Sequence, residues 1–336
     1  MKRISMIGAG SFGTALASML ADSGHNVLLW AREPEVAGAI NREHRNPSYL
    51  PDLRLSPDIR ATSDLDSTLD ERDMVVIATP SHAVREIAGR LRSRLSGNET
   101  VVAVSKGIEQ DTFMTMSRVL VDVLVPQVSE DRIGVLYGPS HAEEVALGKP
   151  TTVVSAANSK STARLVQETF MTGRFRVYLN NDITGVEIGG SLKNIIAIAT
   201  GIVDGLELGD NAKAALMTRG LHEMKRMGMK LGASQDTFSG LTGMGDLIVT
   251  CTSEHSRNRR VGVRVGKGEK LSSVIEHMNM VAEGVRTARS VHQWAKENRV
   301  EMPITEAVCR VLFRDESPAD LIDELMRRNP KEEIMI

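Results

Sequence analysis

The most constraining feature of this 336-residue chain is a glycine loop that directly follows its first apolar run. Gly8, Gly10 and Gly13 have the spacing GxGxxG. The apolar run at residues 4–7 predicts a strand before the loop, and residues 14–21 predict a helix after it. In such a turn the glycines allow tight bending, close approach of the backbone to a pyrophosphate, and close helix–strand packing. The spacing alone would also arise in a plain turn, but this context predicts a dinucleotide-binding domain.

The first half of the chain alternates short β-branched runs with longer amphipathic runs, which is typical of a parallel sheet with crossover helices. The expected strands cover residues 4–7, 27–30, 74–78, 100–104, 133–136, 152–155 and 176–178. After about Asp182 the strand signals stop. We therefore expect an α/β protein with a Rossmann-type, mostly parallel sheet domain at residues 1–180, followed by an all-α domain at residues 181–336.

Helical periodicity in the second half predicts helices at residues 188–203 and 212–227, and at 285–313 with a break at Pro303. A glycine-rich interruption at residues 240–245 predicts a loop that could move. Asp246, which follows it, is a good residue type for a helix N-cap.

Composition excludes several classes of protein. Lys and Arg number 41 against 43 Asp and Glu, and aromatic residues make up 3%. The chain has neither a net positive charge nor interleaved aromatic residues on which bases could stack, so its composition does not indicate a nucleic-acid partner. Neither a signal peptide nor a stretch of ~20 apolar residues is evident, so we expect no membrane span. Two cysteines without metal-like spacing fit a cytoplasmic location, and the histidine spacing predicts no metal site.

The end of the second expected strand bears on the choice of cofactor. An NAD site normally has an acidic residue there for the ribose 2′-hydroxyl, whereas this chain has Arg32. Arg32 could pair with the 2′-phosphate of NADP, or it could be a solvated surface arginine. Glu33 could still reach a ribose hydroxyl. We expect NADP or NAD to bind, with a preference for NADPH.

Later motifs resemble those of the bacterial NAD(P)-dependent glycerol-3-phosphate dehydrogenases. They are Val104-Ser105-Lys106-Gly107-Ile108-Glu109, Gly138-Pro139-Ser140-His141-Ala142, Leu192-Lys193-Asn194, residues 209–216, Leu241-Thr242-Gly243-Met244-Gly245-Asp246-Leu247, Cys251-Thr252-Ser253 and Ser256-Arg257-Asn258-Arg259-Arg260. They follow the family's order over most of the chain. Two positions depart from the residues common in the family. His141 stands where the family often has phenylalanine, and Phe12 stands where it often has an aromatic residue of another type.

The resemblance implies reduction of dihydroxyacetone phosphate to sn-glycerol 3-phosphate for phospholipid synthesis. It implies Lys193 as proton donor and acceptor, with Lys106 and Asp246 beside it in the catalytic group. The substrate would contact Lys106, Gly138, Ser140, Lys193, Asp246, Ser256, Arg257 and Asn258. The cofactor would contact Ser11, Phe12, Arg32, Tyr49, Lys106, Ala142, Arg257, Val281 and Glu283, in addition to Gly8, Gly10 and Gly13 of the glycine loop. A homodimer is one expected assembly.

The residues alone leave these roles open. Lys193 is flanked along its expected helix by Gly189, Gly190, Ala197 and Thr200, so either a ligand or a tightly packed helix approaches there. Residues 256–270 hold six basic side chains and one acidic side chain. This stretch predicts an anion site at a helix N-terminus, or a solvated basic face, which fits Arg264 and Lys267 better than Arg257.

Two other functions remain as alternatives. One is a two-domain reductase that acts on a 3-hydroxy acid or a phosphogluconate. The other is a dinucleotide-binding module without catalysis, which would not need Lys193 and Asp246.

Overall fold

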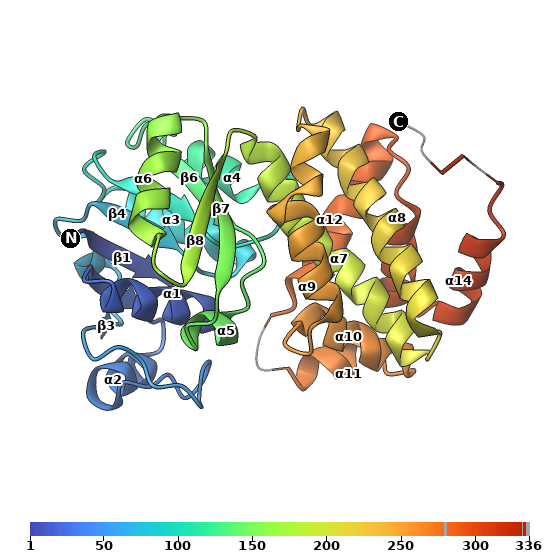
Figure 1. Cartoon of the computed structure of the whole chain (residues 1–336), viewed down its shortest axis with the longest axis horizontal. Helices are drawn as coiled ribbons and strands as arrows, with labels where there is room; N and C mark the ends of the chain where they lie inside the picture. The colour runs from blue at the N-terminus through green and yellow to red at the C-terminus, as the bar shows by residue number, and fades with distance from the viewer. Residues whose placement is uncertain (279–280, 331, 334–336) are drawn as a thin grey trace.

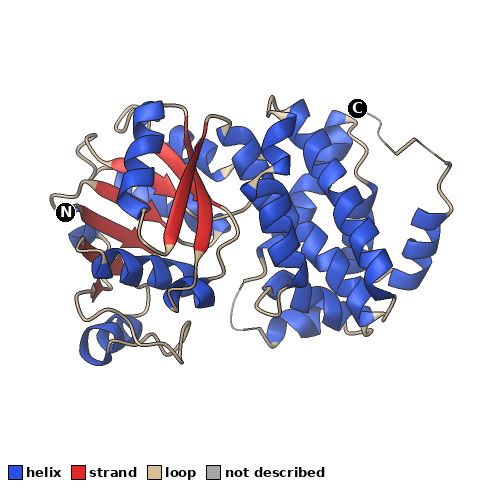
Figure 2. Ribbon diagram, in the orientation of Figure 1, coloured by secondary structure: helices blue, strands red, loops and turns tan. Residues whose placement is uncertain are grey.

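The computed structural model describes residues 1–278, 281–330 and 332–333. The chain forms two parts that lie side by side, one built around a sheet and the other from helices (Figure 1). Figure 2 shows that the strands all belong to the N-terminal part. The expected α/β architecture with an all-α second part is confirmed.

The sheet has eight strands in the order β3-β2-β1-β4-β5-β6-β7-β8. Their bounds are β1 Arg3–Ile7, β2 Asn26–Trp30, β3 Arg60–Thr62, β4 Met74–Ile77, β5 Thr100–Ala103, β6 Ile133–Tyr137, β7 Thr151–Ala157 and β8 Phe175–Asn180. All pairs are parallel except β6 with β7. Seven strands fall where the sequence predicts them. Three-residue β3 was not predicted, because a run that short carries no clear alternation.

Helices cover both faces of this sheet: α1 Ser11–Asp22, α2 Pro34–Glu43, α3 Val84–Arg92, α4 Met116–Leu124, α5 Ala142–Ala146 and α6 Lys160–Phe170. Successive side chains of a strand point to opposite faces. Met74 and Val76 of β4 therefore join the core under α1 and α6. Val75 and Ile77 join the core under α3 and α4. Strands buried on both faces explain the continuous apolar runs in the sequence.

The second part consists of α7 Ile183–Gly205, α8 Gly209–Lys230, α9 Asp246–Thr252, α10 Arg257–Gly266, α11 Leu271–Glu276, α12 Glu283–Asn298, α13 Pro303–Arg314 and α14 Pro318–Met326. α7 runs through its centre (Figure 1). Among the described residues it is the helix that is long and apolar enough to cross a bilayer, yet its most apolar window is entirely buried inside the protein. We therefore interpret α7 as a core helix.

The expectation of a loop at residues 240–245 is wrong. Leu241–Gly245 form a π-helical turn that continues directly into α9. A Cβ on Gly243 would lie 2.1 Å from the carbonyl oxygen of Phe238, so this glycine permits close packing of the turn. Gly245 already has helical backbone angles, and Asp246 does not cap the helix. Its carboxylate instead pairs with Lys193 and Lys106.

Candidate active site

A cleft of about 540 Å³ begins at the glycine loop and reaches α7 and the start of α10. Most of the residues that the sequence singles out line it: Gly8, Gly10, Ser11, Phe12, Arg32, Tyr49, Lys106, Ser140, Ala142, Lys193, Ser256, Arg257, Asn258, Val281 and Glu283. Three expected residues do not. Gly13 packs against Gly8, where a Cβ would lie 2.0 Å from the carbonyl oxygen. Gly138 and Asp246 lie behind the cleft wall and contact its lysines.

The glycine loop forms a cradle with space above it. A Cβ on Gly10 would meet no atom within 4 Å, so the backbone at the N-terminus of α1 is open to the cleft. Gly8 has a φ of +120°, and a side chain there would collide with Ala78. Thr79 adds a shielded hydroxyl with no hydrogen-bond partner among the described residues. These features fit a dinucleotide whose pyrophosphate lies against the helix N-terminus.

Asn46 holds this cradle in shape, and the sequence did not single it out. Its side-chain amide donates to the carbonyl of Ala9 and to the hydroxyl of Thr14, each at 2.8 Å. The Ser11 hydroxyl donates to the backbone carbonyl of Tyr49 at 2.9 Å. The segment after α2 is thereby fixed against the loop that would bind the pyrophosphate.

One buried carboxylate joins two lysines from different parts of the fold. Oδ1 of Asp246 lies 2.5 Å from Nζ of Lys193, and Oδ2 lies 2.8 Å from Nζ of Lys106. Lys193 also donates to the hydroxyl of Thr250 at 2.7 Å, and Lys106 donates to the carbonyl of Gly138 at 2.8 Å. Asp246 is 1% exposed and Lys193 is 7% exposed. Both ammonium groups are therefore held at the cleft wall by fixed acceptors.

Burial lowers the pKa of Lys193 to about 8, because an ammonium group loses its hydration there. The charge of Asp246 opposes this shift, and the charge of Lys106 adds to it. Lys193 can therefore both give up and take up a proton near neutral pH. This is the property expected of a general acid and base.

The adjacent glycines of α7 pack against protein rather than ligand. A Cβ on Gly189 would lie 2.5 Å from the carbonyl oxygen of Thr242, and one on Gly190 would lie 2.7 Å from the ring of Tyr137. Of the two interpretations left open by the sequence, tight packing is correct for the glycines. Lys193 itself is not a surface lysine, because it is buried and lines the cleft.

The start of α10 forms the far wall of the cleft. The Ser256 hydroxyl caps the helix by accepting from the backbone N–H of Arg259 at 3.2 Å. Arg257 makes no ion pair with a carboxylate anywhere in the described ranges. Two other arginines of α10 differ, because Arg259 pairs with Asp204 at 2.6 Å and Arg264 pairs with Glu269. Arg257 Nη1 donates to the carbonyl of Val281 at 3.3 Å. Arg257 is thus a cation at a helix N-terminus with no ion-pair partner among the described residues, which is favourable for an anion.

Asn258 is less available to a ligand than the sequence suggests. Its Nδ2 donates to Oδ1 of Asn194 at 2.9 Å, and its Oδ1 accepts from the backbone N–H of Gly284 at 2.9 Å. One N–H of the amide has no other partner among the described residues. Asn258 therefore links α7, α10 and the start of α12, and it retains one donor.

Paired glycines set the position of α10. Gly262 and Gly266 of α10 face Gly201 and Gly205 of α7, with Cβ positions as little as 2.1 Å from the opposite backbone. Only glycine permits such an approach. The contact between these helices places Ser256 and Arg257 beside Lys193 in one cleft.

Several residues of the cleft were not predicted. Thr250 lies four residues after Asp246 and therefore on the same helix face, a spacing that could have revealed it. His141 also lines the cleft, and burial lowers its pKa. Its Nε2 is shielded and has no hydrogen-bond partner among the described residues.

Glu283, which was predicted to contact the cofactor, also accepts from the backbone N–H of Ser81 at 2.9 Å and so joins the two parts of the fold.

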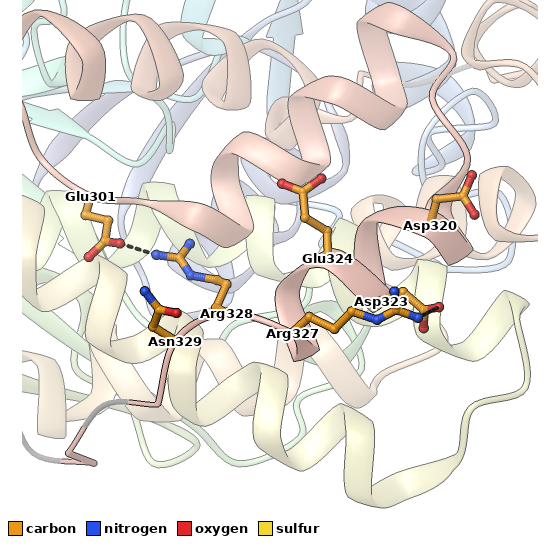
Figure 3. Close-up of a pocket in the computed structure, with 7 residues that line it drawn as sticks. All are labelled: Glu301, Asp320, Asp323, Glu324, Arg327, Arg328 and Asn329. Atoms are coloured by element: carbon orange, nitrogen blue, oxygen red, sulfur yellow. Dashed lines mark hydrogen bonds and ion pairs between the residues drawn. The ribbon is translucent and has the colours of Figure 1, made fainter.

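A second hollow lies far from these residues, on α14 and the segment after it (Figure 3). Its wall is formed by charged and amide side chains: Glu301, Asp320, Asp323, Glu324, Arg327, Arg328 and Asn329. Arg328 is paired with Glu301. No glycine cradle or lysine pair is among these residues, so we place the chemistry in the first cleft.

The chain is similar to known proteins over nearly its whole length. Residues 3–163 match the family model for the N-terminus of NAD-dependent glycerol-3-phosphate dehydrogenase, and residues 182–323 match the model for its C-terminus. The chain is 53% identical to glycerol-3-phosphate dehydrogenase [NAD(P)+] 1 of Salinibacter ruber, covering 99% of this chain and 97% of that protein. It is 48% identical to the Staphylococcus aureus enzyme of that name, covering 99% and 100%. The crystal structure of glycerol-3-phosphate dehydrogenase from Coxiella burnetii matches with a TM-score of 0.92 and 39% identity, over 97% of this chain and 99% of that one.

Proposed function

The chain belongs to the NAD-dependent glycerol-3-phosphate dehydrogenase family, and we propose that Lys193 is the acid and base of its reaction. The activity is reduction of dihydroxyacetone phosphate to sn-glycerol 3-phosphate with NADH or NADPH. The observation that carries the role of Lys193 is its buried ammonium group in the cleft, held by Asp246 and Thr250.

When bound, the reduced nicotinamide supplies a hydride to the substrate carbonyl carbon. Lys193 gives its proton to the carbonyl oxygen as negative charge develops there, and it takes a proton back in the reverse direction. Asp246 keeps Lys193 in place and supports its protonated form. Lys106 pairs with the other carboxylate oxygen of Asp246, and its positive charge favours loss of the proton from Lys193.

The substrate phosphate is proposed to bind at the start of α10. Three features support this placement: the guanidinium of Arg257, which has no ion-pair partner among the described residues, the remaining donor of Asn258, and the helix N-terminus at Ser256. Ser140 and the Gly138 carbonyl that orients Lys106 would lie beside the substrate. Gly8, Gly10, Ser11, Phe12, Gly13, Arg32, Tyr49, Ala142, Val281 and Glu283 are proposed to hold or shape the cofactor site.

We also propose a cofactor preference, a domain boundary, a location and an assembly. Arg32 supports a preference for NADPH, because its guanidinium edge suits a 2′-phosphate. We place the domain boundary at residues 180 and 181, between the end of β8 and the start of α7. A cytoplasmic location, a role in phospholipid synthesis and a homodimer are proposed in line with the family. Exposed Met229 and Leu231 at the end of α8 provide apolar surface for a subunit contact, which light scattering would test.

A direct assay tests the function. Purified protein is mixed with dihydroxyacetone phosphate and NADPH or NADH, and the loss of reduced-nicotinamide absorbance is followed. We expect consumption that depends on the substrate. A 3-hydroxy acid or 6-phosphogluconate, assayed with the oxidised cofactor, tests the alternative reductase. Consumption of neither reduced cofactor would refute the assignment and favour a binding module.

A further inference from the structure

The connection between β2 and α2 places an arginine and a glutamate side by side at the cofactor cleft. β2 ends at Trp30, and the backbone N–H of the next residue, Ala31, donates to the carbonyl of Thr62 at 2.9 Å. Pro34 begins α2. Arg32 and Glu33 are therefore the two residues that join these elements, and both side chains line the cleft.

The guanidinium edge of Arg32 is occupied by its neighbour. Nε and Nη2 of Arg32 both donate to a single oxygen, Oε1 of Glu33, at 2.9 and 2.6 Å. The Arg32 side chain is 79% exposed, so water screens this pair and little stability is lost when it opens. A phosphate in the cleft can therefore take the guanidinium edge from the carboxylate.

The other oxygen of Glu33 has no hydrogen-bond partner in the part of the chain that the structure describes. Glu33 occupies the N-cap position of α2, yet its side chain accepts no backbone N–H of that helix. A carboxylate oxygen without a donor, at the end of the second strand of such a sheet, is suited to accept a ribose 2′-hydroxyl.

We propose that Glu33 is a specificity-determining residue that keeps NADH usable by opposing the preference of Arg32 for NADPH. With NADH, Oε2 accepts the ribose 2′-hydroxyl while Oε1 remains on Arg32. With NADPH, the 2′-phosphate displaces Glu33 from Arg32 and then lies beside a like charge. The inference rests on the proposed function, since it concerns the cofactor of that reaction.

The test compares kcat/KM for NADPH and NADH in the unmodified protein and in Glu33→Gln. Loss of the carboxylate removes a charged acceptor for the 2′-hydroxyl and a repulsion of the 2′-phosphate. The ratio of NADPH to NADH should rise about tenfold, the size of one charge-assisted hydrogen bond. Arg32→Gln should move the ratio in the opposite direction.

Glu35→Gln is the matched control. Glu35 is exposed in the first turn of α2 and is absent from the cleft wall, so its loss removes the same charge two residues away. Its ratio should stay within about twofold of the unmodified protein. The proposal is overturned if Glu33→Gln leaves the ratio unchanged or shifts it no more than Glu35→Gln.

A binding measurement separates this inference from the proposed reaction. Calorimetry with adenosine 2′,5′-bisphosphate and with adenosine 5′-monophosphate probes the adenosine end without any turnover. Glu33→Gln should bind the bisphosphate more tightly and the monophosphate less tightly, so that the ratio of the two affinities rises about tenfold. Absence of dehydrogenase activity would refute the proposed reaction alone. If each fragment bound Glu33→Gln and the unmodified protein with the same affinity, the role of Glu33 would be refuted.

Discussion

The ammonium nitrogen of Lys193 lies 2.5 Å from Oδ1 of Asp246, and both side chains are almost fully shielded from water. A buried ion pair of this kind is weak evidence for stability, because desolvation of two charges offsets much of their attraction. Its value here is that it places a proton at a defined point of the cleft wall.

Replacement of Lys193 by alanine should reduce kcat by about 10²–10⁴-fold, the usual contribution of a positioned acid and base. The dissociation constant for NADPH, followed by nicotinamide fluorescence, should change little. Lys230→Ala, at an exposed end of α8, is the control and should retain full activity. A Lys193→Ala protein with substantial turnover would remove this lysine from the mechanism.

The pH dependence follows from the lowered pKa of Lys193. Reduction of the ketone requires the ammonium form, so kcat/KM for dihydroxyacetone phosphate should fall as the pH rises through about 8. Oxidation of glycerol 3-phosphate requires the neutral amine, so its rate should rise over the same interval. Profiles of kcat/KM in both directions check the sign.

Asp246→Asn should shift that transition to lower pH. The Asp246 charge raises the pKa of Lys193, whereas Lys106 lowers it and would remain. Without the carboxylate, less of the ammonium form survives at neutral pH and reduction slows. A variant that folds, binds NADPH and keeps its transition at the same pH as the unmodified protein would show that another group titrates.

Arg257→Ala should raise KM for dihydroxyacetone phosphate about 10–100-fold, because hydrogen bonds to charged groups contribute about 1.5–3 kcal/mol. Any turnover of unphosphorylated dihydroxyacetone should change little, because that substrate has no phosphate for Arg257 to bind. Arg264→Ala on the same helix is the control, since Arg264 is paired with Glu269 and lies outside the cleft. Equal KM values for the two variants would place the phosphate elsewhere.

Local signals in the sequence predicted the sheet, the glycine cradle and the central helix well. These features depend on residues close together in the chain, such as Gly8 and Gly10 after β1. The sequence could not predict that one carboxylate joins Lys106 and Lys193, because Lys106 and Asp246 are 140 residues apart. Such distances are set by the packing of whole elements.

The wrong interpretation of residues 240–245 has a physical cause. Glycine disfavours helix by about 1 kcal/mol relative to alanine, so three glycines within six residues favour a loop. Tertiary packing overrides this preference here, because Gly243 lies against Phe238, and Gly189 of α7 lies against Thr242 of the turn. Glycines that allow close packing and glycines that allow motion look alike in one sequence.

The contact between α7 and α10 gives a last prediction about how the fold supports the site. In Gly262→Ala the new Cβ would lie 2.1 Å from the carbonyl oxygen of Ile198 and 2.9 Å from Cα of Gly201. Both are backbone atoms, so no side-chain rotation relieves the overlap and α10 must move. Urea denaturation should show a loss of at least about 1–3 kcal/mol in the free energy of unfolding, as for other overpacked positions.

Movement of α10 should also displace Ser256 and Arg257 and raise KM for dihydroxyacetone phosphate. Gly89→Ala in α3 is the control, because a Cβ there meets no atom within 4 Å. That change should stabilise the protein by about 0.5–1 kcal/mol, since alanine favours helix over glycine. If Gly262→Ala had the stability and the KM of the unmodified protein, the paired glycines would not be what positions the proposed phosphate site. The capping of α10 by Ser256 would then have to position that site alone.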